Sequence, residues 1–184
     1  FTPWFANEII ESFANTYKLN HSEILPQNVY VGDINELNDN IDDYPALKDY
    51  EITLVCGGPP CQGFSTANRY QKEMDDPRNK LFFEYIRFVQ NIHPKVIMIE
   101  NVRGLLTRDN GYAINRIKDI LGAEEYNISY AILDASEYGV PQNRKRAIII
   151  GIKKAKNGTD AWGNAFPVLR FWAYLDLGLT QIGH

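Results

Sequence analysis

Residues 57–65 (GGPPCQGFS) hold the side chain with the clearest capacity for chemistry, Cys61. They follow directly on a near-continuous apolar run, residues 52–56, which is typical of a strand buried on both faces. Two glycines and two prolines in succession fix an unusual backbone path, and a cysteine presented there at the rim of a sheet can act as a thiolate nucleophile. The alternative is a small buried cysteine in a tight turn, because free cysteine is often simply a core residue.

A carboxylate and two guanidinium groups are the next candidates. Glu100 follows the next apolar run. As a proton donor it needs a raised pKa, which a dry pocket favours; otherwise it is a solvated carboxylate at a strand end. Arg144 and Arg146 alternate along an extended segment, so both project to one face, where positive charge near Cys61 lowers the pKa of the thiol. The alternative is ordinary surface charge, which we expect for Lys145 on the opposite face.

Strand and helix patterns alternate along the chain and must position these residues. The expected strands lie near residues 4–6, 29–31, 52–56, 96–99, 128–133 and 147–152. Helical spacing relates Ile9, Phe13 and Tyr17, and it recurs in residues 81–92 and 114–121. This order predicts an α/β fold with a doubly wound, mostly parallel sheet. Ligands of such sheets bind beyond the carboxyl ends of the strands, where residues 32–34, 57–65 and 100–102 are expected.

Composition excludes several classes of protein. The 184 residues, 45% hydrophobic and 23% charged, suit one globular domain whose apolar runs are too short to cross a bilayer. Cys56 and Cys61 are too few for a disulfide framework or a zinc site, and they lack the spacing of a C-x-x-C redox pair. We therefore expect no metal, no membrane and, without a visible signal peptide, a reducing cytoplasm. The net charge of −4 means that nucleic acid could be bound only through a local basic patch or a missing segment.

Three blocks together resemble the signature motifs of cytosine-C5 DNA methyltransferases. They are residues 57–65 (GGPPCQGFS), 100–102 (ENV) and 142–146 (QNRKR), in the order and at about the spacing of that family. Residues 75–83 (DDPRNKLFF) are similar to the family's segment that closes a mobile catalytic loop. The resemblance covers roughly residues 4–153 and implies a Rossmann-like methyltransferase fold that uses S-adenosylmethionine.

The resemblance implies transfer of a methyl group from S-adenosylmethionine to C5 of a cytosine that is flipped out of double-stranded DNA. Cys61 would attack C6 of the base, Glu100 would donate a proton at N3, and Arg144 and Arg146 would approach the base, its phosphate and the nucleophile. A loop over residues 66–80 would close over the base. The family's further substrate-binding positions correspond to Gln62, Ser65, Asn101, Val102 and Gln142.

The same resemblance assigns the cofactor-binding positions. They are Glu8, Ile9, Asp33, Ile34, Pro60 and Leu81. Glu8 is expected to follow a strand and open a helix, and it is similar to the family's ribose-binding acid; the alternative is an acid that is favoured by the helix N-terminus. Asp33 resembles the acceptor for the adenine amine, with a helix-starting residue as the alternative. Ile9 stands where the family often has an aromatic residue, which weakens stacking on adenine.

Parts of the family pattern are missing from the chain. The family's glycine-rich cofactor turn would lie before residue 1. The family's target-recognition domain has no room after residues 142–146, the arginine block. We therefore expect a catalytic core in residues 1–155 and a linker or remnant in residues 156–184. Two alternatives stay open: a family member that methylates cytosine in tRNA, and a non-catalytic or split subunit that needs a complementary chain. A short core of this kind suggests a bacterial restriction-modification enzyme in the cytoplasm, associated with the nucleoid when bound to DNA.

Overall fold

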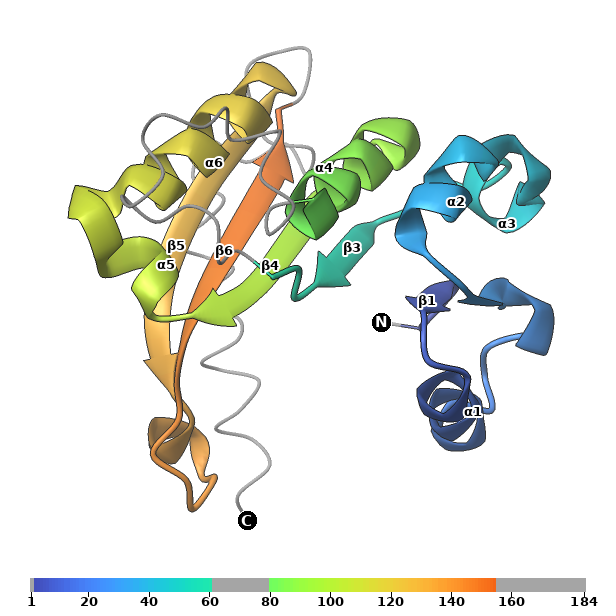
Figure 1. Cartoon of the computed structure of the whole chain (residues 1–184), viewed down its shortest axis with the longest axis horizontal. Helices are drawn as coiled ribbons and strands as arrows, with labels where there is room; N and C mark the ends of the chain where they lie inside the picture. The colour runs from blue at the N-terminus through green and yellow to red at the C-terminus, as the bar shows by residue number, and fades with distance from the viewer. Residues whose placement is uncertain (1, 61–79, 155–184) are drawn as a thin grey trace. The chain divides into compact units, whose positions relative to one another are not determined.

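Residues 2–60 and 80–154 are described by a computed structural model, in which the chain separates into two units (Figure 1). Unit 1 comprises Phe1–Ile52 and Leu81–His93, and unit 2 comprises Thr53–Lys80 and Pro94–His184. Among the described residues, every helix is too short or too polar to span a membrane. The predicted core over residues 1–155 stays a prediction.

Unit 1 combines a two-stranded parallel sheet with short helices. Its elements are β1 (Ala6–Glu8), α1 (Glu11–Asn20), η1 (Pro26–Asn28), β2 (Val29–Val31), α2 (Ile34–Asp39), η2 (Ile41–Asp43), α3 (Pro45–Lys48) and, from its second residue onward, α4 (Lys80–Ile92). Ala6 lies opposite Val29, and Glu8 lies opposite Val31. Parallel neighbours need a crossover connection, which α1 supplies between the two strands. The residues that follow β1 and β2 therefore emerge at the same edge of this sheet.

The apolar core of unit 1 consists of two clusters. The first is formed by Ala14, Ile24 and Val29, and the second by Leu37, Ile41 and Leu47. Phe88 and Ile92 of α4 pack against the second cluster. The apolar stripe predicted for residues 81–92 is present, since α4 buries Phe82, Tyr85, Ile86 and Val89. Phe88 and Ile92 therefore attach α4 to the helices that follow β2.

The apolar face predicted for the first helix is wrong. Ile9 and Phe13 were expected to face inward with Tyr17, but Ile9 precedes the helix and Phe13 is 59% exposed. The buried residue of α1 is instead Ala14. Ala14 packs with Ile24 and with Val29 of β2.

Unit 2 is built on a four-stranded mixed sheet. Its elements are β3 (Leu54–Gly57), β4 (Val96–Val102), α5 (Gly104–Thr107), η6 (Arg108–Gly111), α6 (Tyr112–Ala123), β5 (Tyr126–Asp134), η7 (Ala135–Tyr138) and β6 (Lys145–Lys153). The strand order is β3-β4-β6-β5. β3 and β4 are parallel, whereas β6 is antiparallel to both β4 and β5.

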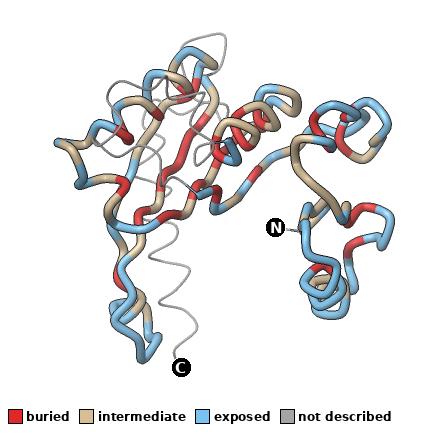
Figure 2. Tube along the Cα trace, in the orientation of Figure 1, coloured by how far each residue is buried: buried red, intermediate tan, exposed pale blue. Residues whose placement is uncertain are grey.

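The core of unit 2 covers both faces of its central strands. Buried residues run along the middle of the sheet in Figure 2. On one face Val96, Ile150 and Ile152 form a cluster. Because side chains alternate along β6, Ala147 and Ile149 point to the other face. α6 contacts β5 and buries Ala113, Ile114, Ile117 and Leu121.

The described strands depart from the mostly parallel sheet that the sequence predicts. Parallel pairing holds for β1–β2 and β3–β4, but β5 and β6 form an antiparallel pair. The connection between them, residues 135–144, contains only the short η7 and no α-helix. A parallel crossover needs about a dozen residues or more and usually a helix, so this connection forces the chain to reverse.

Candidate active site

Glu100 and Arg146 form an ion pair on one face of the unit 2 sheet. Glu100 lies opposite Ile148, and Val102 lies opposite Arg146. Glu100 and Arg146 are therefore diagonal neighbours on the same face, within reach of long side chains. Arg146 Nε lies 2.8 Å from Glu100 Oε1, with side-chain exposures of 27% and 42%. β4 extends through Val102, so the ENV block lies within the strand and not in a loop after it.

The backbone of Gly58 approaches the same carboxylate. A Cβ atom at Gly58 would lie 3.3 Å from Glu100 Oε2 and 3.6 Å from Glu100 O. That contact is tighter than ordinary van der Waals packing, so a larger residue would displace the carboxylate by a few tenths of an ångström. The carboxylate of Glu100 thus touches Arg146 through one oxygen and faces the segment leading to Cys61 through the other.

Asn101 ties this segment to β4. Its side chain is only 8% exposed, and Nδ2 donates a hydrogen bond of 2.8 Å to Pro59 O. Its Oδ1 accepts from the N–H of Val102 at 3.0 Å. A buried amide with satisfied partners fixes local geometry, so Asn101 positions the backbone two residues before Cys61. Substrate-binding roles for Asn101 and for Val102, which is 58% exposed, stay predictions.

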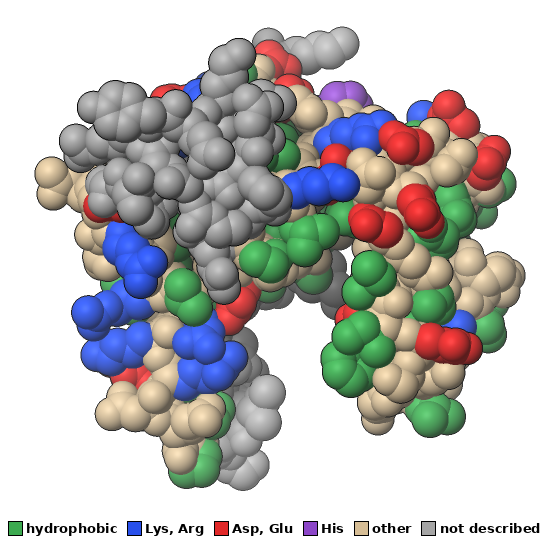
Figure 3. Space-filling view, in the orientation of Figure 1, with side chains coloured by type: hydrophobic (Ala, Val, Ile, Leu, Met, Phe, Trp, Pro, Cys, Tyr) green, Lys and Arg blue, Asp and Glu red, His purple; other side chains and the backbone are tan. Residues whose placement is uncertain are grey.

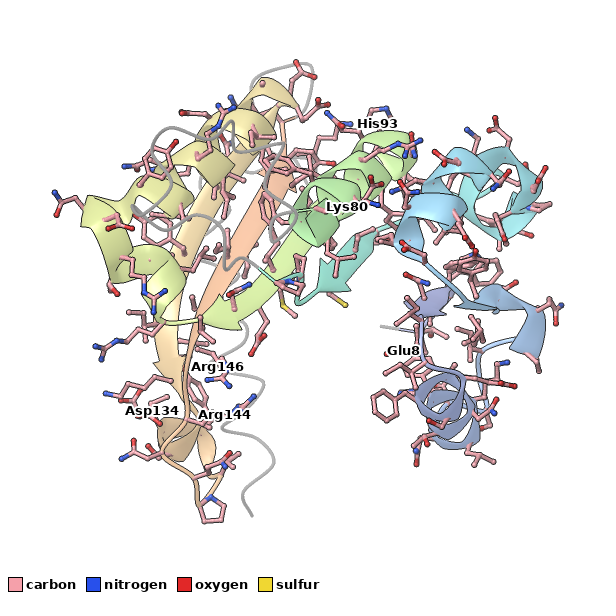
Figure 4. All side chains as sticks on the ribbon, in the orientation of Figure 1. Glu8, Lys80, His93, Asp134, Arg144 and Arg146 are labelled. Carbon is pink, nitrogen blue, oxygen red and sulfur yellow. The ribbon has the colours of Figure 1, made fainter. Side chains whose placement is uncertain are left out.

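The arginine block begins just before β6. Arg144 is exposed and precedes the strand, whereas Arg146 lies within it. Figure 4 shows both arginine side chains on the same side of the chain at the start of β6. Lys145 has an ion-pair partner of its own, because its Nζ lies 3.7 Å from Asp134 Oδ2. Gln142 is exposed in the preceding connection, and its N–H donates to Val140 O at 2.7 Å.

Glu8 ends β1 and does not open the helix, contrary to the prediction from the sequence. Its Oε1 accepts from the N–H of Ile10 at 2.9 Å, and α1 begins one residue later. The backbone of Gly32 is held nearby, since its N–H donates to Glu8 O at 3.1 Å and its carbonyl accepts from Asn7 Nδ2 at 2.8 Å. Glu8 therefore stands at the carboxyl end of a parallel strand.

Asp33 lies two residues after the end of β2. Its Oδ1 accepts from the N–H of Asn35 at 2.8 Å, so it caps α2, as the alternative to cofactor binding anticipated. Ile34 begins the helix and is half-buried, and Ile9 is 63% exposed. The carboxyl ends of neighbouring parallel strands are where nucleotide ligands bind in α/β folds. Unit 1 thus places two carboxylates and exposed apolar surface at one sheet edge.

Several predicted residues lie outside the part of the chain that the structure describes. They are Cys61, Gln62, Ser65 and residues 66–79 of the predicted loop. Of the remaining cofactor candidates, Pro60 is exposed and Leu81, in the first turn of α4, is 44% exposed. Among the described residues no group of three or more His, Cys, Asp or Glu side chains could hold a metal ion.

The two units differ sharply in charge. Unit 1 has three Lys and Arg residues against eleven Asp and Glu, a formal net charge of −8. Unit 2 has sixteen Lys and Arg residues against twelve Asp and Glu, a formal net charge of +4. Lys and Arg side chains gather near the start of β6 in Figure 3. A local basic surface therefore exists within an acidic chain.

A profile of the C-5 cytosine-specific DNA methylase family matches residues 1–171. The chain belongs to this family. This membership agrees with the three motifs in the sequence, two of which the structure brings together in the Glu100–Arg146 pair.

Relatives of known type match most of the chain. Type II methyltransferase M.BanI of Aneurinibacillus aneurinilyticus is 40% identical over 151 residues, which cover 82% of this chain and 32% of that protein. M.AgeI of Thalassovita gelatinovora is 36% identical over 153 residues, covering 82% of this chain and 34% of the relative. This chain thus spans about a third of the length of these relatives. A solved structure of a DNA modification methyltransferase encoded within an E. coli prophage matches this chain with a TM-score of 0.63 and 31% sequence identity. The match covers 81% of this chain and 39% of the prophage protein.

Sequence reasoning missed three features of the site. The approach of Gly58 to Glu100 had only the paired glycines as a signal. The hydrogen bond from Asn101 to Pro59 had no signal in the sequence, because it joins residues far apart in the chain. The buried carboxylate of Asp134 could have been found from the Asp-x-Ser pattern of a helix cap, since Ser136 N–H donates to it at 3.2 Å.

Proposed function

We propose that this chain carries the active site of a DNA (cytosine-5-)-methyltransferase, which methylates C5 of cytosine in double-stranded DNA. The observation that carries the proposal is the carboxylate of Glu100, which contacts Arg146 and lies against Gly58, three residues before Cys61. An acid, a guanidinium group and the segment that leads to Cys61 thus lie close together. Membership of the methylase family supports the same activity.

The chemistry assigns a separate task to each side chain. The Cys61 thiolate forms a bond to C6 of cytosine, and Glu100 donates a proton to N3, so the ring does not accumulate negative charge. S-adenosylmethionine supplies the methyl group to the activated C5. Loss of the C5 proton, cleavage of the Cys61–C6 bond and return of the N3 proton to Glu100 then restore the aromatic ring, the thiolate and the acid. Arg146 holds the Glu100 carboxylate in position before the base arrives.

S-adenosylmethionine suits the sheet edge of unit 1, which we propose as part of a Rossmann-like cofactor site. Glu8 is assigned to the ribose hydroxyls and Asp33 to the adenine amine. Both are already held by backbone N–H groups, which pre-orients their carboxylates. We assign Ile9, Ile34 and Leu81 to the adenine, and the family resemblance assigns Pro60 to the sulfonium. The net charge of −8 in unit 1 favours a cofactor that carries positive charge.

Unit 2 suits DNA because its excess of positive charge can neutralise phosphates. We assign Arg144 and Arg146 to the flipped nucleotide, and Gln62, Ser65, Asn101, Val102 and Gln142 to the surrounding base and backbone contacts. The base must leave the stack because C5 and C6 cannot be reached inside a duplex. We propose that a complementary subunit or segment reads the target sequence. We place the enzyme in a bacterial restriction-modification system.

Transfer of a labelled methyl group tests the proposal. The complete protein that contains this chain is incubated with labelled S-adenosylmethionine and either duplex DNA or tRNA. We expect label in C5 of DNA cytosine and loss of at least about 100-fold of the rate in a Glu100→Gln variant. Label in tRNA alone would establish the RNA alternative. Absence of label in both acceptors, with the cofactor bound, would establish the non-catalytic alternative.

A further inference from the structure

Asp134 is a buried carboxylate that the proposed chemistry does not use. It is the last residue of β5 and is only 6% exposed. Its Oδ1 accepts from the N–H and Oγ of Ser136, at 3.2 Å and 2.9 Å, and from the N–H of Arg144 at 3.2 Å. Its Oδ2 faces Lys145 Nζ at 3.7 Å. Desolvation acts to raise the pKa of Asp134, but the hydrogen bonds from Ser136 and Arg144 and the charge of Lys145 outweigh it, so the pKa lies below its ordinary value.

These contacts close the connection between β5 and β6 at its base. The N–H of Ala135 donates to Arg144 O at 3.0 Å, and the N–H of Arg144 donates to Asp134 Oδ1. Both backbone polar groups of Arg144 are thus engaged by the end of β5. Asp134 also lies directly opposite Lys145 in the strand register. The carboxylate therefore fixes the place at which β6 begins.

The start of β6 determines where the arginine side chains point. Arg144 lies just before the strand, and Arg146 is its second residue, opposite Leu133 of β5 and Val102 of β4. A slip of one residue in a strand moves every side chain to the other face. In β6 such a slip would turn Arg146 away from Glu100.

A cap for η7 alone does not account for this arrangement. The bonds from Ser136 suffice to cap that short helix, as Asp commonly does at a helix start. The bond from Arg144 comes from ten residues further along the chain and contributes nothing to the helix. Figure 4 shows Asp134 beside the start of β6, close to Arg144 and Arg146.

We propose that Asp134 is a positioning residue for the methylation reaction: its carboxylate holds the backbone of Arg144 and thereby directs Arg144 and Arg146 to the flipped cytosine and to Glu100. This role rests on the proposed function. If this role is correct, removal of the Asp134 carboxylate lowers the rate of methyl transfer by displacing the two arginines, and not only by destabilising the fold.

A double-mutant cycle separates these two effects. Single-turnover methyl transfer to DNA is measured at saturating DNA and cofactor for the complete protein, for Asp134→Ala, for the Arg144→Ala/Arg146→Ala variant and for the variant that combines all three substitutions. Displacement of a substrate-orienting group by about 1 Å lowers rates about 100-fold, so we expect Asp134→Ala to lose about 10–100-fold. In the Arg144→Ala/Arg146→Ala background the same substitution should lose less than about 3-fold. Equal losses in both backgrounds would show a structural role only and overturn the proposal.

Two further variants keep the test decisive if Asp134→Ala fails to fold. Asp134→Ser retains a capping oxygen for Ser136 but is too short to accept from Arg144 as well, so we expect the rate to fall as in the alanine variant. Asp134→Asn retains the accepting oxygen and should restore the rate to within about 5-fold of wild type. Wild-type rates in Asp134→Ser would overturn the role of Asp134 and leave the proposed function intact. A wild-type protein without methyl transfer would instead contradict the proposed function, and with it this role.

Lys145→Gln is the matched control, because it removes the cation that faces Asp134 but leaves the bond to Arg144. The Lys145 side chain is 52% exposed, and exposed ion pairs contribute little to stability. We expect its rate of methyl transfer to stay within about 2-fold of wild type. A loss as large as that of Asp134→Ala would show that charge at Lys145, and not the hold on Arg144, explains the effect.

Discussion

The carboxylates that we assign to the cofactor in unit 1 and to the reaction in unit 2 are held in different ways. In unit 1 Glu8 and Asp33 each accept from the backbone N–H two residues further along the chain. In unit 2 Glu100 contacts a side chain from another strand, and Asp134 accepts from the far end of a connection. The acids of unit 1 are therefore oriented by local turns, whereas those of unit 2 depend on strand register. Substitutions should accordingly affect cofactor binding through unit 1 and the rate of chemistry through unit 2.

The largest effect is expected for Glu100→Gln. The amide keeps the size of the side chain but cannot donate a proton to N3 as the acid does, so methyl transfer should fall about 100–10,000-fold. The dissociation constant for S-adenosylmethionine, measured by calorimetry, should change less than about 2-fold. Glu137→Gln is the control, because Glu137 is exposed in η7 and should leave the rate unchanged. A large change in cofactor affinity with little change in rate would contradict the division between the units.

Glu8→Gln should give the opposite pattern. The amide oxygen can still accept from Ile10, but the charge that we assign to the ribose hydroxyls is lost. A hydrogen bond to a charged group is worth about 1.5–3 kcal/mol, so the KM for S-adenosylmethionine should rise about 10-fold or more while the rate at saturation changes little. Glu11→Gln in the first turn of α1 is the matched control. An unchanged KM in Glu8→Gln would remove Glu8 from the cofactor site.

The sequence predicts the features of the molecule that depend on neighbouring residues better than those that join distant segments. The strands at Val29–Val31 and Leu54–Gly57 and the helix at residues 80–92 follow from local apolar patterns. The motifs identified the family, and the capping role of Asp33 was foreseen because it depends on neighbours in the chain. The antiparallel β6 and the contacts of Glu100 and Asn101 join distant segments, which local patterns do not specify.

Gly58→Ala should have an intermediate effect on the rate. The added Cβ would lie 3.3 Å from Glu100 Oε2 and displace the carboxylate from Arg146 by a few tenths of an ångström. We expect a loss of about 5–10-fold in methyl transfer, since the catalytic geometry is sensitive to such shifts. The thermal midpoint should change little, because the displaced atoms end a flexible side chain. Gly122→Ala is the control, since a Cβ there meets nothing within 4 Å. Equal rates for both variants would contradict the tight approach to Glu100.

The smallest effect concerns acid stability. The pKa of Asp134 is lower in the folded state than its ordinary value of about 3.9. Its stabilising contribution is therefore complete above that value and is lost as the pH falls through the folded pKa. Urea unfolding should show the largest difference between wild type and Asp134→Asn near pH 6 and a smaller one near pH 3. A difference that stays constant over this range would show that the charge of Asp134 is not involved.

Covalent trapping on DNA that contains 5-fluorocytosine tests the central claim most directly, because fluorine at C5 prevents the bond to the enzyme from being released after methyl transfer. With S-adenosylmethionine present, the complete protein should form an adduct that survives denaturation. Cys61→Ser should form none, and Glu100→Gln should form it at least about 100 times more slowly. An adduct with the serine variant, or none with the wild-type protein, would contradict a thiolate–carboxylate site on this sheet.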